Sequence, residues 1–127
     1  MTNLTDLTVD SLTISSTVQH APTHEHLDAD GAINIKCGIA TLAKLVAGVI
    51  TMTLANPTAT TDDYKVLTIV NAQAQANVIG IAGSGFGNGG ANYVKCTFTG
   101  ALGDSLQLMA YQGYWYVIGG NSYTLSA

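Results

Sequence analysis

The sequence contains no arginine and only four lysines, and charged residues make up 9% of its 127 positions, against about a quarter in an average protein. Nucleic-acid binding requires clustered basic side chains that displace counterions from phosphates. Four scattered lysines on a chain of net charge −4 do not provide such a cluster, and the forked recognition of phosphate by arginine is excluded as well. We therefore expect no nucleic-acid partner.

No apolar run approaches the length of about 20 residues that spans a bilayer. The first six residues also lack the basic start and apolar stretch of a secretory signal, so we expect no membrane partner. Only two cysteines occur, Cys37 and Cys96, without a CxxC pair or another metal-binding spacing. A disulfide between them is compatible with the sequence, but without an export signal we expect two reduced core cysteines.

The chain is instead rich in apolar residues (47%), in glycine and in threonine, which occurs sixteen times. Threonine and β-branched apolar residues favour strands, and short strands at a spacing of about 8–12 residues with turns between them indicate a sandwich or barrel. We expect an all-β fold, a compact antiparallel β-sandwich or barrel with an extended N-terminal arm. Because so few charges cover the surface of a monomer, we also expect a homotrimer.

The chain divides into three segments. Residues 1–18 contain short alternating apolar runs joined by a bend, and we interpret them as an arm that lies on another surface. Residues 19–31 have no periodicity and contain all three histidines, as is typical of a linker. Residues 32–127 form the expected β-rich body.

The body contains several alternating or continuous apolar segments. Residues 33–39 predict one half-buried strand. Residues 39–50 would also suit a helix stripe, but the alternation after them favours strands. The nearly continuous apolar run 65–71 predicts a central strand, and Gln112-Gly113 predicts a tight hairpin.

The glycine-rich run 83–92 predicts a long exposed loop. No lysine follows it at the spacing of a phosphate-binding loop, and no helix pattern opens after it. We select Gly83, Phe86 and Asn88 as a candidate exposed binding loop.

The histidines offer the one candidate metal cluster. Imidazoles at i and i+2 of an extended chain point the same way and would share one ion, but one chain supplies too few ligands for a closed zinc site. We therefore expect no metal and no cofactor, with His24 and His26 as the candidates in a trimer. The aspartate pairs 28/30 and 62/63 lie in loops, where aspartate is a common turn former, and we expect no enzyme activity.

The last hairpin carries four neighbouring aromatic residues, Tyr111, Tyr114, Trp115 and Tyr116. Aromatic rings on an exposed strand would stack on sugars. The alternative, which we favour, is that Trp115 and Val117 fill the core while the tyrosines pack across strands or against a neighbouring subunit.

Two regions of the body carry a resemblance to a known class. A Pro-x-x-x-x-Asp-Asp loop (57–63) leads into a Leu-Thr-Ile strand (67–69) and an Ala-Gln-Ala turn (72–76), and Gly-Asp-Ser-Leu-Gln-Leu (103–108) is followed by Trp-Tyr-Val (115–117). These runs resemble small structural proteins of tailed bacteriophages. Residues 7–14 are similar to N-terminal segments of phage fibre and decoration proteins, and His24-Glu25-His26 matches a His-x-His iron motif of some phage fibres.

The resemblance implies a virion component made in the cytoplasm of a bacterial host. We expect a capsid decoration protein that binds the major capsid protein on the outer capsid surface as a trimer and stabilises the shell. The alternative is a head or tail fibre domain that binds a host-surface glycan or receptor. One short arm and one body favour decoration, because an arm can add a strand to a sheet edge of the shell. The arm residues expected to contact the capsid are Leu4, Leu7, Val9, Leu12, Ile14 and Val18.

Overall fold

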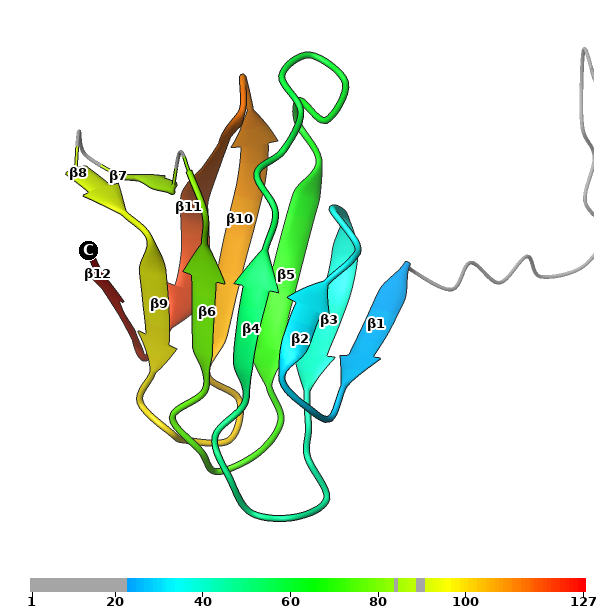
Figure 1. Cartoon of the computed structure of the whole chain (residues 1–127), viewed down its shortest axis with the longest axis vertical. Helices are drawn as coiled ribbons and strands as arrows, with labels where there is room; N and C mark the ends of the chain where they lie inside the picture. Colours follow the sequence, from blue (N-terminus) through cyan, green and yellow to red (C-terminus); the bar gives the residue numbers. More distant parts are fainter. Residues whose placement is uncertain (1–22, 84, 89–90) are drawn as a thin grey trace, which may run out of the picture.

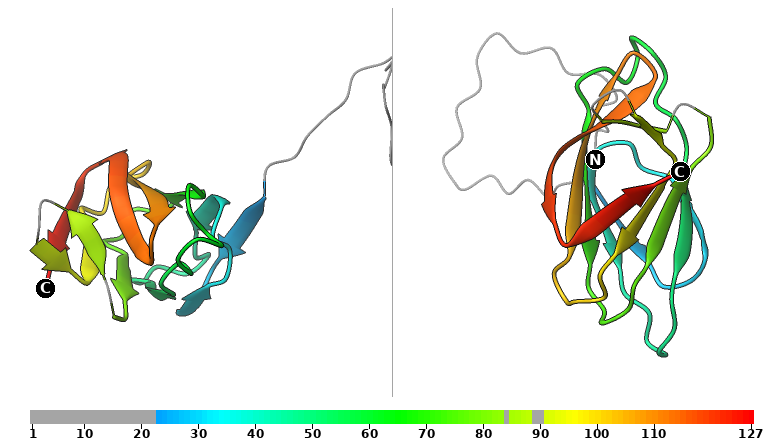
Figure 2. Two further views of the ribbon diagram at one scale, coloured as in Figure 1. Left: turned by 90° about the horizontal axis from the view of Figure 1, so that it is seen from above. Right: turned by 90° about the vertical axis from the view of Figure 1, so that its left-hand side faces the viewer.

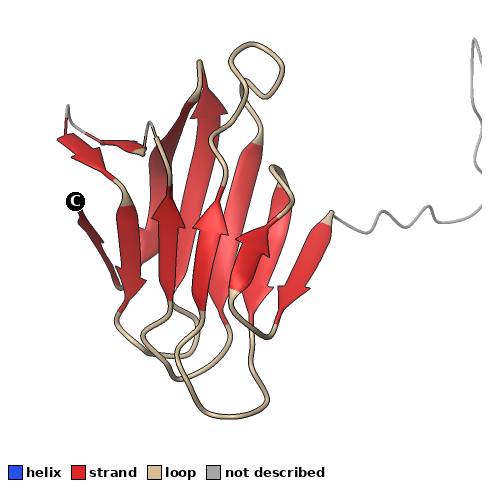
Figure 3. Ribbon diagram, viewed as in Figure 1, coloured by secondary structure: helices blue, strands red, loops and turns tan. Residues whose placement is uncertain are grey.

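A computed structural model describes residues 23–83, 85–88 and 91–127, and within these ranges the chain is all-β. Two sheets pack face to face, and loops join the strands at both ends (Figures 1 and 3). The strands are β1 (His24–Leu27), β2 (Gly31–Ile33), β3 (Gly38–Leu42), β4 (Thr51–Leu54), β5 (Val66–Asn71), β6 (Val78–Ile81), β7 (Phe86–Asn88), β8 (Ala91–Tyr93), β9 (Lys95–Phe98), β10 (Ser105–Tyr111), β11 (Tyr114–Asn121) and β12 (Tyr123–Ser126).

The larger sheet has the order β1-β3-β5-β10-β11-β7-β8, and the smaller sheet has the order β12-β9-β6-β4-β2. The first six strands alternate between the two sheets, so that β1, β3 and β5 are parallel neighbours in one sheet and β2, β4 and β6 are parallel neighbours in the other. The β-sandwich architecture is thus confirmed, but the expected purely antiparallel pairing is wrong. In the first half of the chain, each loop connects a strand of one sheet to a strand of the other sheet.

The core lies between the two sheets, as the view from above makes plain (Figure 2). Strands with one face toward the core alternate buried and exposed residues, as in β10, where Leu106, Leu108 and Ala110 are fully buried. The largest fully buried side chains are Trp115, Phe86 and Phe98. Burial of each such side chain contributes about 2–3 kcal/mol, so this interior holds the two sheets together.

Several expected boundaries are corrected. The expected single strand 33–39 is broken by a loop at 34–37, because Gly38 adopts a φ of +95° and starts a new strand in the other sheet. Residues 43–50 form a loop, neither strand nor helix. The expected linker is not separate from the body over 24–31, since β1 and the start of β2 lie there.

No helix long and apolar enough to cross a membrane occurs in the described ranges.

Candidate functional site

The residues expected to contact a capsid all lie outside the described residues: Leu4, Leu7, Val9, Leu12, Ile14 and Val18. The described chain begins just before β1, and β1 is an edge strand of the larger sheet. An edge strand keeps one row of backbone N–H and C=O groups free of its own sheet. The edge at β1 therefore offers a place where a further strand can pair.

The candidate loop of Gly83, Phe86 and Asn88 does not form one exposed site. Phe86 is fully buried and pairs with Trp115, because β7 joins the larger sheet beside β11. Gly83 is exposed, with a φ of +91°, whereas Asn88 is the last residue of β7. The expectation that Phe86 is exposed is wrong. The glycines around it predict a loop, whereas the structure forms the short strands β7 and β8 there.

His24 and His26 are both exposed on β1, and Glu25 lies between them. The Glu25 carboxylate accepts hydrogen bonds from the backbone N–H of Asn34 (2.9 Å) and of Ile35 (3.2 Å), and from the Asn34 side chain (2.8 Å). Glu25 therefore fastens β1 to the loop after β2. No group of three or more His, Cys, Asp or Glu side chains that could hold a metal ion gathers within the described part of the chain.

Asp62 is a buried carboxylate between two lysines. Its oxygens lie 2.8 Å from Lys36 Nζ and 2.7 Å from Lys65 Nζ, and the Thr58 N–H donates to it over 2.7 Å. These hydrogen bonds, those from Lys36 and Lys65 above all, hold the pKa of Asp62 well below its usual range, and the bond to Asp62 raises the pKa of Lys65. A carboxylate that stays ionised in this way fixes a loop and does not act as a general acid.

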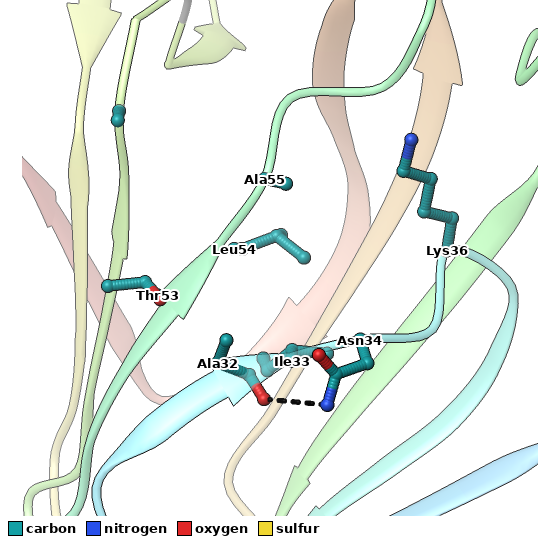
Figure 4. A pocket seen from close by; sticks show the side chains of 8 residues that line it. Ala32, Ile33, Asn34, Lys36, Thr53, Leu54 and Ala55 are labelled. Carbon is teal, nitrogen blue, oxygen red and sulfur yellow. Dashed lines mark hydrogen bonds between the residues drawn. The ribbon is translucent and has the colours of Figure 1, made fainter.

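A pocket of about 360 Å³ opens beside β2 and β4 (Figure 4). Its walls are mainly aliphatic, with the polar side chains of Asn34, Lys36 and Thr53. The Lys36 ammonium is engaged by Asp62, and no carboxylate, imidazole or thiol belongs to the lining. The pocket therefore offers no general acid or base for catalysis.

Both cysteines are free. Cys96 lies in the core, where burial raises the pKa of its thiol to about 12, so this thiol is protonated at neutral pH and is a poor nucleophile. Cys37 lies in the half-buried loop before β3, outside the core where the sequence predicted it.

The β3–β4 and β9–β10 loops lie at one end of the sandwich, at the bottom of Figure 1, and they carry four exposed apolar residues. We call Leu45, Val46, Val49 and Leu102 the apolar end. Leu45 is fully exposed, and Val46 and Leu102 are 73% and 71% exposed. They belong to the β3–β4 and β9–β10 loops, which the chain places at the same end of the molecule. Sequence periodicity missed this surface, because consecutive apolar residues predict a buried strand.

The loop of Leu45 and Val46 is held by the side chain of Gln73 from the β5–β6 loop. The Gln73 Oε1 accepts from the Lys44 N–H (2.6 Å), and its Nε2 donates to the Gly48 carbonyl oxygen (3.2 Å). The same Nε2 donates to Asn77 Oδ1 (2.8 Å), which also accepts from the Ile50 N–H (2.7 Å). Gln73 and Asn77 thus anchor both ends of the loop.

Two further buried polar side chains complete this base. Asn77 donates to Asn71 Oδ1 (2.6 Å), and Asn71 in turn donates to the carbonyl oxygen of Ala101 (3.3 Å), next to Leu102. Asp104 accepts from Thr99 Oγ1 and from two backbone N–H groups of the same loop. Burial alone would raise the pKa of Asp104, but these hydrogen bonds outweigh it and lower the pKa. Apolar side chains therefore project from a fixed framework.

A second surface lies on the outward side of the larger sheet. We call Tyr64, Tyr111, Tyr114 and Tyr116 the tyrosine face. Tyr111 lies opposite Tyr114 in the β10–β11 register, and the ring centroids of Tyr64 and Tyr111 are 5.6 Å apart. The expectation that Trp115 fills the core is confirmed, since it is fully buried and donates from Nε1 to the Ala55 carbonyl oxygen (2.9 Å).

A comparison with protein-family models and a comparison with curated proteins each find no match to this chain. The function is therefore argued from the surfaces of the body and from the residue patterns of the sequence.

Proposed function

We propose that this chain is a virion structural protein, a capsid decoration protein that binds the outer capsid surface as a homotrimer and stabilises the shell. The observation that carries the proposal is the apolar end. Four aliphatic side chains stand exposed on loops that buried hydrogen bonds hold in place. Exposed apolar side chains on anchored loops at one end of a body are typical of a surface that another protein covers.

The electrostatics of the chain support an apolar attachment. The chain carries −4 at neutral pH, so three copies carry three times −4, or −12. Charge attraction to a phosphate or carboxylate surface is therefore weak, whereas apolar contact and main-chain pairing need no charge. Among the described strands, β1 is an edge of the larger sheet, and this edge supplies a place for such pairing.

The second candidate function is a head or tail fibre domain that binds a host-surface glycan or receptor. The tyrosine face favours it, because exposed aromatic side chains are common in binding surfaces. The number of copies on a purified particle separates the two functions. A number near that of the major capsid protein indicates decoration, and a few copies at the tail indicate a fibre.

The test uses capsids of the source phage that lack this protein. We expect added protein to sediment with the capsids and to raise the temperature at which they break, because a ligand of the intact shell stabilises it by mass action. Since the contact is mainly apolar, binding should persist in 1 M salt, which reduces the Debye length to about 3 Å. Loss of binding in moderate salt, or an unchanged breaking temperature, would contradict the decoration function.

Two variants locate the contact. The double substitution Leu45→Ser with Leu102→Ser should weaken capsid binding at least tenfold, and Ile118→Ser, an exposed apolar residue of β11, is the matched control. Deletion of residues 1–18 should abolish binding and leave the thermal unfolding of the body nearly unchanged. Equal weakening by Leu45→Ser with Leu102→Ser and by Ile118→Ser would remove the apolar end from the contact.

A further inference from the structure

The tyrosine face is built from rows of outward residues across three strands. The register of β5 and β10 places Val66 opposite Met109, and the register of β10 and β11 places Met109 opposite Tyr116. One step further along, Tyr111 lies opposite Tyr114 and beside Tyr64. The next row in the other direction is polar, because Thr68 lies opposite Gln107. The surface thus passes from aromatic to amide and hydroxyl side chains.

The loop that carries Tyr64 is fixed in an uncommon conformation. Tyr64 has a φ of +68°, which costs a non-glycine residue about 1–2 kcal/mol. Its N–H donates to the Ala110 carbonyl oxygen (2.7 Å), and this bond ties the loop to β10. Tyr64 nevertheless remains 70% exposed, so the core does not require its side chain. Backbone strain that positions an exposed side chain often indicates a binding site.

Asp63 ties the same loop to the β10–β11 turn. Its carboxylate accepts from the Gln112 N–H (2.7 Å) and from the Gln112 Nε2 (2.6 Å), and the φ of Gln112 is +47°. The turn between Tyr111 and Tyr114 is thereby joined to the residue before Tyr64. The tyrosines on both sides are held before any ligand arrives, and this reduces the entropy that binding must overcome.

Three of the four tyrosines are only partly exposed. Tyr111, Tyr114 and Tyr116 are 40%, 38% and 37% exposed, so part of each side chain is covered by the sheet. Tyr116 contacts β7, where a Cβ on Gly87 would stand 2.9 Å from its ring; a side chain there would displace the ring. The centroids of Tyr114 and Tyr116 are 6.3 Å apart at an interplanar angle of 49°. Tyr64, in the β4–β5 loop, is the most exposed of the four.

The charge of this surface selects the class of ligand. The outward rows from Tyr64 and Val66 to Thr68 contain no charged side chain on β5, β10 or β11. Asp63 at the margin is already hydrogen-bonded by Gln112. A charged ligand would thus lose hydration without gaining an ion pair. An uncharged ligand that has both apolar C–H faces and many hydroxyl groups matches both halves of the surface.

We propose that the tyrosine face binds a neutral oligosaccharide of hexose units. The slightly positive C–H groups of a pyranose ring fit the negative face of a tyrosine ring, and the sugar hydroxyls fit the amide and hydroxyl groups of Gln107, Gln112 and Thr68. This site lies near the β10–β11 turn, at the other end of the sandwich from the apolar end (Figure 1). It is independent of the proposed capsid function and remains accessible on a protein bound through the apolar end.

The test incubates the labelled full chain with an array of neutral, sialylated and sulfated oligosaccharides, and then titrates the best neutral oligosaccharide by NMR. We expect retention on neutral hexose oligosaccharides and shift changes at the tyrosine face. Tyr111→Ala and Tyr114→Ala should each weaken binding at least tenfold, and Thr124→Ala, which changes an exposed residue of β12 in the smaller sheet, should not change it. If either substitution impairs folding, Tyr64→Ala, in the exposed loop, gives the same test.

Three outcomes would overturn the proposal. The first is that no neutral oligosaccharide is retained above the level of Tyr111→Ala. The second is retention of charged oligosaccharides alone. The third is that NMR of the free protein finds the four tyrosines protected from solvent by another copy of the chain, in which case the tyrosine face is a subunit contact.

Discussion

Asp62 is the residue that joins the β2–β3 loop to the β4–β5 loop. It accepts hydrogen bonds from Lys36 in the loop before β3 and from Thr58 and Lys65 at the two ends of its own β4–β5 loop. Asp62 is 3% exposed, so removal of its charge leaves the two ammonium groups without a counter-ion, and an amide in its place offers one acceptor oxygen to three donors. The net contribution of such a buried ion pair to the free energy of unfolding is small, but removal of the carboxylate alone is costly because the lysines lose their counter-ion.

We expect Asp62→Asn to lower the free energy of unfolding by about 2 kcal/mol at pH 7. The pKa of Asp62 is lowered in the folded protein from an ordinary value of 3.8. Its stabilisation is therefore complete above pH 3.8 and is lost as the pH falls below that value toward the folded pKa. The difference between wild type and Asp62→Asn should shrink below pH 3.8. Urea denaturation at pH 7, 4 and 2.5 measures it.

Asp28→Asn is the matched control, since it removes the same charge from an exposed loop residue and should change the free energy of unfolding by less than about 0.5 kcal/mol. Asp104 also has a lowered pKa, so Asp62→Asn should keep part of the acid sensitivity of the wild type. A difference that stays constant from pH 7 to pH 2.5 would mean that ionisation of Asp62 does not contribute.

At the scale of elements, the parallel pair β1–β3 depends on a close backbone approach. The Ile39 N–H donates to the Thr23 carbonyl oxygen (2.9 Å), and this carbonyl lies so near Gly38 that a Cβ there would collide with it. Gly38 also has a φ of +95°. No other residue satisfies both conditions, so the start of β3 depends on this glycine.

We expect Gly38→Ala to destabilise the fold by about 3 kcal/mol, because backbone strain and steric overlap add. Gly31→Ala is the matched control, since nothing lies within 4 Å of a Cβ at that position. Its effect should stay below about 1 kcal/mol. Thermal unfolding of both variants measures the difference, and equal unfolding temperatures would contradict the importance of the close approach.

The elements differ in how well the sequence predicts them. The strand at 66–71 and the hairpin around Gln112-Gly113 are confirmed, because their apolar runs and turn residues act locally. The parallel pairing of β1, β3 and β5 was not predictable. It depends on which of the two sheets each following strand joins, and the loop sequences do not specify this. The strand β7 was missed because glycines leave only Phe86 as an apolar signal.

The candidate sites also divide into features that local sequence predicts and features that it does not. The inward Trp115 and the outward tyrosines could be predicted, because strand alternation separates neighbours on the last hairpin. The apolar end could not, because an exposed loop such as 45–49 has the same composition as a buried strand. The role of Gln73 and Asn77 beneath it was also missed, since a run of alanine, glutamine and asparagine predicts only a polar turn.

At the scale of the whole molecule, two different surfaces lie at different ends of one rigid body. The apolar end is aliphatic and the tyrosine face is aromatic and polar. A monomer would leave both in water at the same time. We therefore expect the protein to associate, with the copies arranged about one axis so that the same surface of each faces the same way.

Multi-angle light scattering of the purified protein at micromolar concentration should give three times the chain mass of 13.1 kDa. The physical reason is that 47% of the residues are apolar and only 9% are charged, so a monomer has few charged side chains to cover its surface. A stable monomer at this concentration would contradict the trimer. Leu45→Ser with Leu102→Ser, measured alongside, tells whether the apolar end takes part in this association or is reserved for the shell.

The alternation of β1 to β6 between two sheets also has a consequence for how the chain acquires its structure during synthesis. The ribosome delivers the parallel half first, and every strand pair in that half closes a loop of about ten residues or more, which slows pairing. The antiparallel pair β10–β11, closed by the two residues Gln112 and Gly113, is delivered near the end, with only β12 after it, and forms fastest. β10 then pairs with the waiting β5. We therefore expect the C-terminal hairpin to fold before the N-terminal strands pair, although the N-terminal strands are synthesised first. Until that hairpin emerges, the N-terminal half must stay soluble by itself or bind a chaperone.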